Sequence, residues 1–480
     1  MSATVSFTKP TDPAEQELTM NGSIVAGNLA QRAALVDAQS AGAEMFGWMT
    51  ELYPICRSIT GEGFRETQRY LQQIVPDLQV RSVPSGTQCF DWTVPAEWNI
   101  RDAYVVGPDG QKVIDFQQSN LHVVNYSTPI DQRMPLHQLR EHLHTLPELP
   151  DQIPYRTSYY QRAWGFCLTQ HQFDQLPDGE YHVVIDSDLN DEGCMNYGEL
   201  LLPGESDEEV LISAHACHPS LCNDNLSGVV IAATLARLMQ QVRRRYSYRF
   251  LWVPGGVGSV VWMSQNRDKL SNIQHGLVLT CLGDPGDFTY KRTRRGDAEI
   301  DQAAINVLKY SGGEHRVIDF SPYGYDERNY NSCRYQLPVG SLSRSQYGEY
   351  YGYHASGDNL DQMSPDRLGE SFMMYVSILK VLENNHTYIN TIPDAEPQLG
   401  KRGLYSMMGG LQGRDRMELV FLWVMNLSDG QHSLLDISDR SGYSFDLIQQ
   451  GAEILCEHGL LRRADEGDNR LTSERAKGAE

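Results

Sequence analysis

The stretch HACHPSLCNDNLSG, from His215 to Gly228, decides the fold of this chain. It follows an apolar run, Val210 to Ala214, that predicts a buried strand, and it precedes a second apolar stretch, Val229 to Met239, that predicts a helix. Loops at the carboxyl ends of strands in open α/β sheets are where ligands bind. Imidazole and carboxylate groups on such a loop are ligands that hold zinc. The stretch therefore predicts an α/β domain with a candidate metal site.

Composition limits what the chain is expected to bind. It contains 40 lysines and arginines against 62 aspartates and glutamates, a net charge of −22, which argues against nucleic acid or an anionic membrane as a partner. The nine cysteines are scattered and odd in number, which favours a reducing, cytoplasmic setting over a disulfide framework. The N-terminus shows no signal-peptide pattern, and no apolar run approaches the roughly 18 residues of a membrane span.

The chain is long enough for several domains. Strands and helices alternate from 196 to 388, which predicts an α/β sheet. Short β-rich pieces, including 102–116, 119–127 and 180–189, predict a small inserted β-domain. The expected division is an N-terminal tail at 1–40, a discontinuous central domain at 41–90 and 196–388, the insert at 91–195, a helical domain at 395–465 and a C-terminal tail at 466–480.

The helical domain has the spacing of a winged helix-turn-helix. Three helices are predicted at 417–426, 434–441 and 444–458, followed by a wing strand at 459–463. The would-be recognition helix carries Asp446, Glu453 and Glu457 and neither lysine nor arginine, so it would repel phosphate. We therefore expect this domain to contact a protein partner or a second copy of the chain, and not DNA.

Longer stretches resemble a known family. The strand–HxC–loop–NDNLSG–helix unit resembles the zinc aminopeptidases that share a fold with glutaminyl cyclases. Their pattern is His-x-Asp at a strand end, then Asn-Asp-(Asn/Asp)-x-Ser-Gly opening a helix. Nearly everything after residue 41 resembles a bacterial aminopeptidase-like subgroup, through SYYQRAWGFCL, YKRTRRGDAEID, PYGYDER, YHASGDNLD and EPQLGKRGLY. The resemblance implies a zinc-aminopeptidase-like α/β domain with a mixed sheet, a small inserted β-domain and a C-terminal winged helix.

The resemblance also implies a set of metal ligands. His215 stands at the family's first histidine ligand, Asp224 at its bridging aspartate, and His354, in YHASGDNLD, at its last histidine. These three are enough for one zinc ion with an open position for water. His218 is a further candidate, either as a fourth ligand or as a donor supporting the others, and a histidine simply hydrogen-bonded within the loop is the alternative.

The chain departs from the family pattern at three places. The family has two glutamates after the middle strand, one a general base and one a ligand, where this chain has the loop 254–259, PGGVGS. The family's aspartate on the next strand falls on Thr280, and its aspartate two residues after the first histidine falls on Cys217. One zinc ion is therefore expected, not two. The PGGVGS loop could also cradle phosphate, but no lysine follows it.

Two carboxylates near the pocket are candidates for the missing base. Glu327 or Asp326, in PYGYDERNY, would take a proton from the water, because a general base must lie within hydrogen-bond reach of it. A surface charge cluster is the alternative interpretation. Asp358 follows His354 by four residues and is expected either to orient that ring or to cap a helix at Asn359.

The cysteines of the loop leave further alternatives open. Cys217 is expected to lie behind the ligands, as the family's aspartate does. Thiolate ligation of zinc by Cys217 and Cys222 would instead close the site and make it structural. A third alternative is a cysteine nucleophile with His218 as its base.

Tyrosines are dense around the predicted cleft, and Tyr325, Arg328 and Tyr353 are expected to line a substrate pocket. The resemblance implies a zinc-dependent amide hydrolase of aminopeptidase type with a single metal and without the usual glutamate base. Its substrate would be peptide-like, or a small amide or sugar-linked molecule. Two alternatives stay open: a non-hydrolytic metal-binding or scaffolding protein of the same fold, and acyl transfer or cyclisation of a small metabolite.

Overall fold

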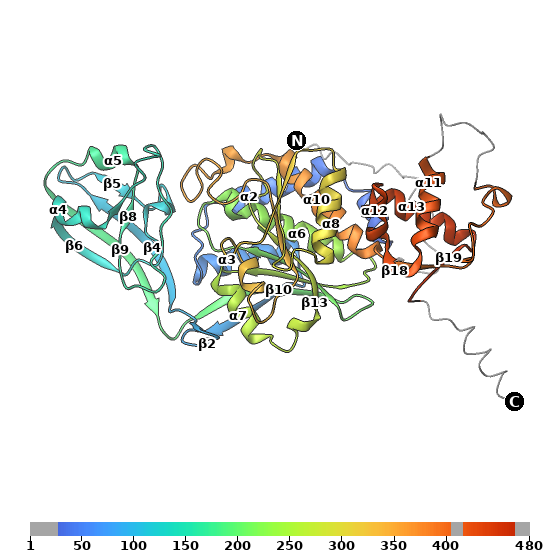
Figure 1. Cartoon of the computed structure of the whole chain (residues 1–480). Helices are drawn as coiled ribbons and strands as arrows, with labels where there is room; N and C mark the ends of the chain where they lie inside the picture. Colours follow the sequence, from blue (N-terminus) through green and yellow to red (C-terminus); the bar gives the residue numbers. More distant parts are fainter. Residues whose placement is uncertain (1–26, 405–415, 466–480) are drawn as a thin grey trace, which may run out of the picture.

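The computed structural model describes residues 27–404 and 416–465, and its centre is an eight-stranded mixed sheet (Figure 1). Strands β12, β11, β13 and β16 pair in parallel, whereas β10 and β14 run antiparallel to β12 and β16. In sheet order the strands are β1 (Gln79–Pro84), β10 (Cys194–Leu202), β12 (Ser247–Val253), β11 (Glu209–His215), β13 (Ile273–Leu279), β16 (Val339–Ser343), β14 (Phe288–Lys291) and β15 (His315–Ile318). The expected mixed-sheet α/β fold is confirmed.

The path of the chain places the carboxyl end of the central strand β11 at the candidate site. From β11 the chain crosses through α6 (Ser227–Met239) to β12, and then returns through α7 (Val257–Gln265) past β11 to β13. Since such crossovers are right-handed, a reversal of direction puts α6 and α7 on opposite faces of the sheet. The reversal makes the carboxyl end of β11 a topological switch point, where ligands bind in open α/β sheets.

Helices cover the central strands so completely that β11 and β12 are buried along their whole length. Helix α6 packs against α2 and α10, and α10 packs against α8. A strand covered on both faces needs apolar residues at almost every position, as the run from Val210 to Ala214 has. The remaining helices of this domain are α1 (Leu29–Ala33), α2 (Ala38–Leu52), α3 (Glu62–Ile74), α8 (Glu299–Tyr310), α9 (Glu327–Tyr330) and α10 (Pro365–Asn384).

A second sheet, with its own hydrophobic core, lies to one side of the central one (Figure 1). Its four antiparallel strands are β5 (Lys112–Asp115), β4 (Glu97–Val106), β9 (Glu180–Asn190) and β6 (Ile130–Pro135). The β-rich piece at 119–127 forms no named strand: 120–122 are a 3₁₀-helix, and Val123 and Asn125 make isolated bridges. The short elements here are α4 (Leu136–Leu139), α5 (Gln170–Asp174), β7 (Leu143–His144) and β8 (Phe166–Cys167), and the hairpin β2 (Gln88–Cys89) and β3 (Trp92–Thr93) precedes them.

The C-terminal part consists of three helices and a three-stranded sheet. The helices are α11 (Arg416–Leu427), α12 (Leu434–Ser441) and α13 (Phe445–Glu457), and the strands, in sheet order, are β18 (Asp429–Ser433), β17 (Thr387–Asn390) and β19 (Leu461–Arg463). Asp446, near the start of α13, forms an ion pair with Lys380 of α10 at 2.8 Å. Asn306 of α8 donates a 2.8 Å hydrogen bond to Ser438 of α12. The would-be recognition helix is therefore held against the central domain at its N-terminal end.

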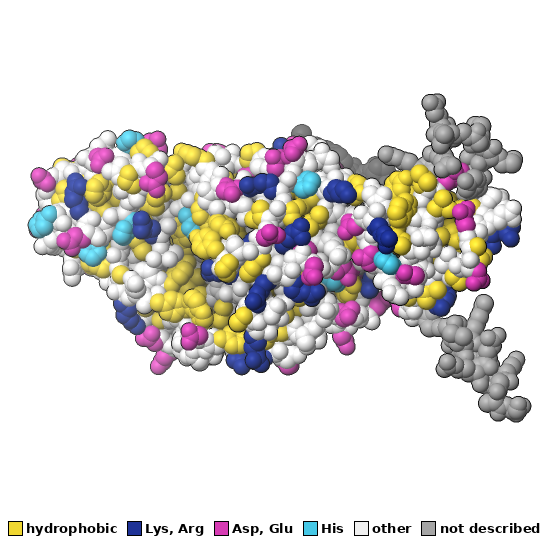
Figure 2. Space-filling model, viewed as in Figure 1, with side chains coloured by type: hydrophobic (Ala, Val, Ile, Leu, Met, Phe, Trp, Pro, Cys, Tyr) yellow, Lys and Arg dark blue, Asp and Glu magenta, His cyan; other side chains and the backbone are white. Residues whose placement is uncertain are grey.

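Two predicted segments lie outside the described residues: 1–26 of the N-terminal tail, and the C-terminal tail at 466–480. Residues 27–40 are described and contain α1 and the start of α2, so helical structure begins before the predicted domain start at 41. On the face shown in Figure 2, acidic and basic side chains are interspersed, and hydrophobic ones gather over the central domain. Among the described helices, none combines the length and the apolar composition needed to cross a membrane.

A buried ion-pair cluster joins three neighbouring strands of the central sheet. Arg249 of β12 bonds to Glu209 of β11 at 2.6 and 2.8 Å and to Glu199 of β10 at 2.6 Å. We predict that Arg249→Met lowers the free energy of unfolding by about 3–5 kcal/mol, because it leaves the buried Glu209 without its cation and Glu199 with only the half-exposed Arg81. Thermal and denaturant unfolding measure this loss.

The matched control is Arg101→Met in the insert. Arg101 also bridges two carboxylates, Asp186 and Asp188, but all three side chains are about half exposed, so the expected loss is below about 1 kcal/mol. Equal losses in the two variants would contradict the structural role of the buried cluster.

Candidate functional site

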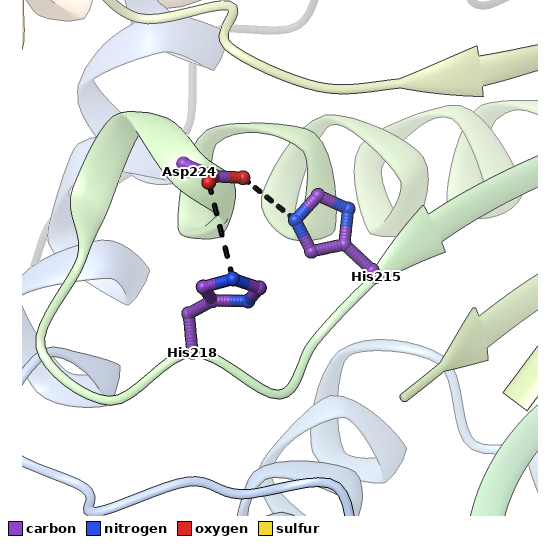
Figure 3. A group of neighbouring side chains, drawn as sticks. All are labelled: His215, His218 and Asp224. Carbon is purple, nitrogen blue, oxygen red and sulfur yellow. Dashed lines mark hydrogen bonds and ion pairs between the residues drawn. The ribbon is translucent and has the colours of Figure 1, made fainter. Parts of the chain in front are cut away.

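The side chains that follow β11 meet around one carboxylate (Figure 3). His215 Nε2 lies 2.7 Å from Asp224 Oδ1, and His218 Nε2 lies 3.9 Å from Asp224 Oδ2. The ligand atoms of these three residues all lie within 4.8 Å of one another. His354, from the loop after β16, is outside this tight group, but its Nε2 lies 3.0 Å from Asp224 Oδ2. All four candidate ligands therefore converge on Asp224.

Burial and charge set the protonation of this cluster. Burial disfavours the charge of Asp224, but His218 and His215 outweigh it and hold the pKa of that carboxyl well below its usual range. Burial also opposes a charged His215, yet the neighbouring Asp224 raises the pKa of its ring. For His218 burial dominates and lowers the pKa to about 3, so its ring is neutral. Neutral imidazole and ionised carboxylate are what zinc binds, so the donor set fits this metal.

Asp358 holds the backbone turn that carries Asp224. Its carboxylate accepts hydrogen bonds from the backbone N–H groups of Cys222, Asn223 and Asp224, at 3.0, 2.6 and 3.0 Å. The Tyr350 hydroxyl donates a fourth bond at 2.8 Å. The sequence predicted that Asp358 would either orient the ring of His354 or cap a helix at Asn359. Its carboxylate bonds to this turn instead, and the side chain of Asn359 itself caps the helix. Burial raises the pKa of Asp358 to about 6.

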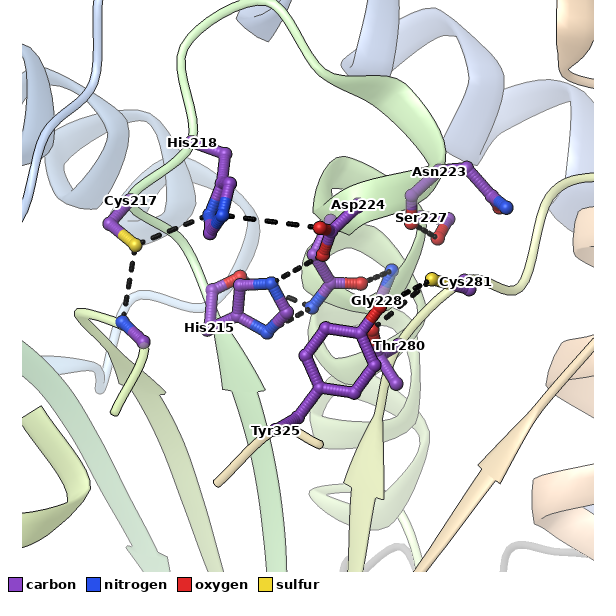
Figure 4. A network of polar contacts seen from close by, with 12 residues as sticks. His215, Cys217, His218, Asn223, Asp224, Ser227, Gly228, Thr280, Cys281 and Tyr325 are labelled. Atoms are coloured by element: carbon purple, nitrogen blue, oxygen red, sulfur yellow. Dashed lines mark hydrogen bonds and ion pairs between the residues drawn. The ribbon is translucent and has the colours of Figure 1, made fainter. Parts of the chain in front are cut away.

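Asn225 fixes the other side of this turn through bonds to His215 and Gly228, both of which are labelled in Figure 4. Its side-chain amide donates to the carbonyl oxygens of His215 and Leu279, at 3.2 and 2.9 Å. Its side-chain oxygen accepts from the backbone N–H of Gly228 at 3.2 Å. The ends of β11 and β13 and the start of α6 are thereby tied together directly behind the histidines.

An aromatic ring packs against each histidine. Tyr325 stacks on His215, with ring centroids 5.1 Å apart, and Tyr353 stacks on His354 at 4.1 Å. The ring of Tyr155 contacts both His218 and His354, at 5.0 and 5.4 Å. Imidazoles held in this way have little freedom to rotate away from Asp224. Sequence reasoning anticipated Tyr325 and Tyr353 but missed Tyr155.

The segment of Tyr155 belongs to the insert, and it also holds the loop of His354. The backbone N–H of Tyr155 donates to the His354 carbonyl at 2.8 Å, and that of Ser356 donates to the Ile153 carbonyl at 2.9 Å. The buried Gln152 side chain accepts from the Gly357 N–H at 2.6 Å. His354 itself has a φ of +53°, a left-handed conformation that such surrounding contacts must maintain.

Cys217 lies behind the ligands, in contact with His218. Its sulfur lies 3.3 Å from His218 Nδ1 and accepts a hydrogen bond from the Gly255 N–H at 3.2 Å. Burial raises the pKa of Cys217 to about 12, so the thiol is neutral. A neutral, buried thiol is a poor nucleophile, and the Cys217 sulfur is not part of the group of ligand atoms that lie within 4.8 Å of one another. Cys222 is also buried, with its pKa raised by burial.

The two candidate bases have different surroundings. One oxygen of Asp326 accepts from the Gly256 N–H at 2.8 Å and from the Ser259 hydroxyl at 2.7 Å, and its other oxygen is buried with no partner among the described residues. Glu327 forms a buried ion pair with Lys291 at 2.9 Å. Sequence reasoning missed Lys291, since nothing near it in the chain indicates this pairing.

A pocket of about 300 Å³ opens onto the histidines. It is lined by Tyr155, Thr157, Tyr159, His215, Cys217, His218, Gly255, Gly256, Tyr323, Gly324, Tyr325, Asp326, Arg328, Tyr353 and His354. The three predicted pocket residues, Tyr325, Arg328 and Tyr353, are among them, and so is Asp326 but not Glu327. Such a volume is at the lower end of small-molecule sites.

The fold that holds this pocket is that of the zinc aminopeptidases. The zinc aminopeptidase BSAP from Bacillus subtilis superposes with a TM-score of 0.55 over 72% of this chain and 95% of its own, at 11% identity. A domain of unknown function, DUF4910, matches residues 46–385, and a winged helix-turn-helix family matches 386–463. The chain belongs to the DUF4910 family, and the predicted winged helix is confirmed.

Two relatives come from Clostridium acetobutylicum. One, provisionally named a polysaccharide biosynthesis protein with an aminopeptidase-like domain, is 50% identical over 426 residues, which is 89% of this chain and 98% of the relative. The other is the crystal structure of a provisionally assigned peptidase, 47% identical, with a TM-score of 0.86 over 91% of this chain and all of the other. The expected resemblance to aminopeptidase-like proteins is confirmed.

We predict that Gln152→Ala loosens the loop of His354 without unfolding the protein. The substitution removes the acceptor of the Gly357 N–H and opens a space in the contact between insert and loop. Hydrogen–deuterium exchange across 352–358 should accelerate about tenfold, which mass spectrometry measures. The exposed Gln132→Ala on β6 is the control, and unchanged exchange in Gln152→Ala would show that the insert does not hold this loop.

Proposed function

We propose that this protein is a single-metal amide hydrolase of aminopeptidase type that acts on a small peptide-like substrate. The observation that carries the proposal is the convergence of three histidines on the buried Asp224 at the floor of a pocket. The aminopeptidase-like fold and the names of the relatives support a peptidase-like function. His215, His218, Asp224 and His354 would hold the ion. When bound, zinc supplies a Lewis acid that polarises the scissile carbonyl.

Asp326 is the better candidate for the general base. Its Oδ1 is fixed by two donors, so the carboxylate cannot rotate freely, and its Oδ2 is left without a partner among the described residues. Asp326 lines the pocket together with His215, and its carboxylate would take the proton of an attacking water. Glu327 is assigned a positioning role, because its pairing with Lys291 fixes the segment that carries Tyr325 and Asp326.

One observation favours the second candidate function, a metal-binding protein without hydrolytic activity. Three imidazoles and one carboxylate are enough to fill all four positions of a structural zinc site, which leaves none for water or substrate. The 39% exposed side chain of His354 supports the hydrolytic candidate instead, because substrate can displace a ligand at the pocket edge more easily than a buried one.

We predict that purified protein contains one zinc ion per chain and that His215→Ala and His218→Ala each weaken its binding at least about 100-fold. Removing a ligand costs more than the 10–100-fold that removing a supporting residue costs. Elemental analysis and competition with a chromophoric chelator measure this. His182→Ala, which removes an insert histidine paired with Asp131, is the control and should keep the metal. Metal-free protein that stays metal-free in excess zinc would refute both candidate functions.

A second prediction separates the two candidates by rate. With zinc bound, wild-type protein should cleave members of a panel of aminoacyl amides and dipeptides, and Asp326→Asn should lower kcat about 10²–10⁴-fold at unchanged zinc content. Ser259→Ala, which removes one donor from the other oxygen of Asp326, should cost far less. Glu327→Gln should chiefly lower the melting temperature. A zinc-loaded wild type that leaves the whole panel intact favours the non-hydrolytic function.

A further inference from the structure

Arg328 projects at the pocket from a helix that is tied to the loop after β12. The neighbours of Arg328 provide the ties: Asp326 accepts from the Gly256 N–H at 2.8 Å, and Asn329 donates to the Gly256 carbonyl at 2.9 Å. The guanidinium lies over Gly256, since a side-chain carbon built there would be 3.4 Å from Arg328 Nη2. Hydrogen bonds made by the residues before and after Arg328 thus fix its backbone. Its guanidinium faces Gly256, which has no side chain.

The guanidinium of Arg328 contributes no polar contact to the fold within the described residues. It is exposed, lines the pocket, and makes no ion pair, hydrogen bond or ring contact within the part of the chain that the structure describes. The buried cations nearby are engaged: Arg57 donates to the His218 carbonyl at 3.0 Å, and Lys291 pairs with Glu327. An arginine that presents a planar fork of donors to a pocket suits a carboxylate or a phosphate.

The other charges of the pocket agree with an anionic ligand. Asp326 is the one carboxylate among the pocket-lining residues, and one of its oxygens already accepts two hydrogen bonds. Arg328 is the one lysine or arginine among the same lining residues. In a chain with a net charge of −22, its guanidinium is therefore the group of this pocket that attracts an anion.

We infer that the substrate of this site carries an anionic group, a carboxylate or a phosphate, that binds Arg328 above Gly256 while its amide lies over the histidines. The inference deepens the proposed function and rests on it for the location of the amide. A substrate that offered only a free ammonium group would meet a like charge at this position. Arg328 is therefore a specificity-determining residue.

The test compares binding of four acetamides by calorimetry to the zinc-loaded, full-length protein. N-acetylalanine and N-acetylalaninamide differ only in a carboxylate, and N-acetylethanolamine phosphate and N-acetylethanolamine differ only in a phosphate. We expect at least one anion to bind about tenfold or more tighter than its neutral counterpart, since a charge-assisted bidentate contact contributes that much. Arg328→Gln should abolish the preference, and Arg334→Gln, an exposed arginine outside the pocket lining, should keep it.

The same titrations identify the anion that is preferred and show whether Arg328 or zinc binds it. Preference in the carboxylate pair alone identifies a carboxylate substrate, and preference in the phosphate pair alone identifies a phosphate. Zinc itself binds anions, so the titrations are repeated on metal-free protein, where the dependence on Arg328 should persist. Equal binding within both pairs, or a preference that survives Arg328→Gln, overturns the inference. Anion binding that depends on Arg328, without hydrolysis of any amide, overturns only the proposed reaction.

Discussion

The requirement to compensate one fully buried carboxylate organises this site. Asp224 is inaccessible to solvent, and an isolated carboxylate in such a place would cost several kcal/mol. Three histidines supply the compensation on one side, and the turn held by Asp358 supplies the rigid backbone on the other. The tyrosines then hold the histidines. The tyrosines, the histidines and the turn all bear on the position of Asp224. A substitution in any of them is therefore expected to disturb the same carboxylate.

Local parts of this arrangement could be read from the sequence, and distant parts could not. His215, His218 and Asp224 lie within ten residues between a strand and a helix, so chain geometry alone brings them together. His354 was placed only through the resemblance, because no local pattern links it to Asp224. Tyr155 and Lys291 were missed because their roles depend on contacts between separate domains or strands. The α/β class was predictable from the alternating strands and helices, whereas the mixed sheet was expected only through the resemblance.

The insert changes how the pocket should be understood. In the central sheet, the carboxyl ends of parallel strands supply the floor, but residues 152–159 supply one wall and hold the loop of His354. The short helix α9 and its N-cap contribute an arginine, Arg328, and a carboxylate, Asp326, to the pocket lining. The floor is thus built on the central sheet, whereas the rest of the lining comes from the insert and from the segment of α9.

The glycines at 255 and 256 differ in whether a residue with a side chain could replace them. A Cβ atom at Gly255 would meet only ordinary van der Waals contacts, the nearest 3.4 Å away at His215, so the backbone there tolerates a side chain. Gly256 has a φ of +72°, which a glutamate would adopt only with strain. Position 255 can therefore accept a side chain, whereas position 256 can accept one only with strain. With this backbone, a pair of adjacent carboxylates at 255 and 256 would therefore carry strain that a single carboxylate at 255 would not.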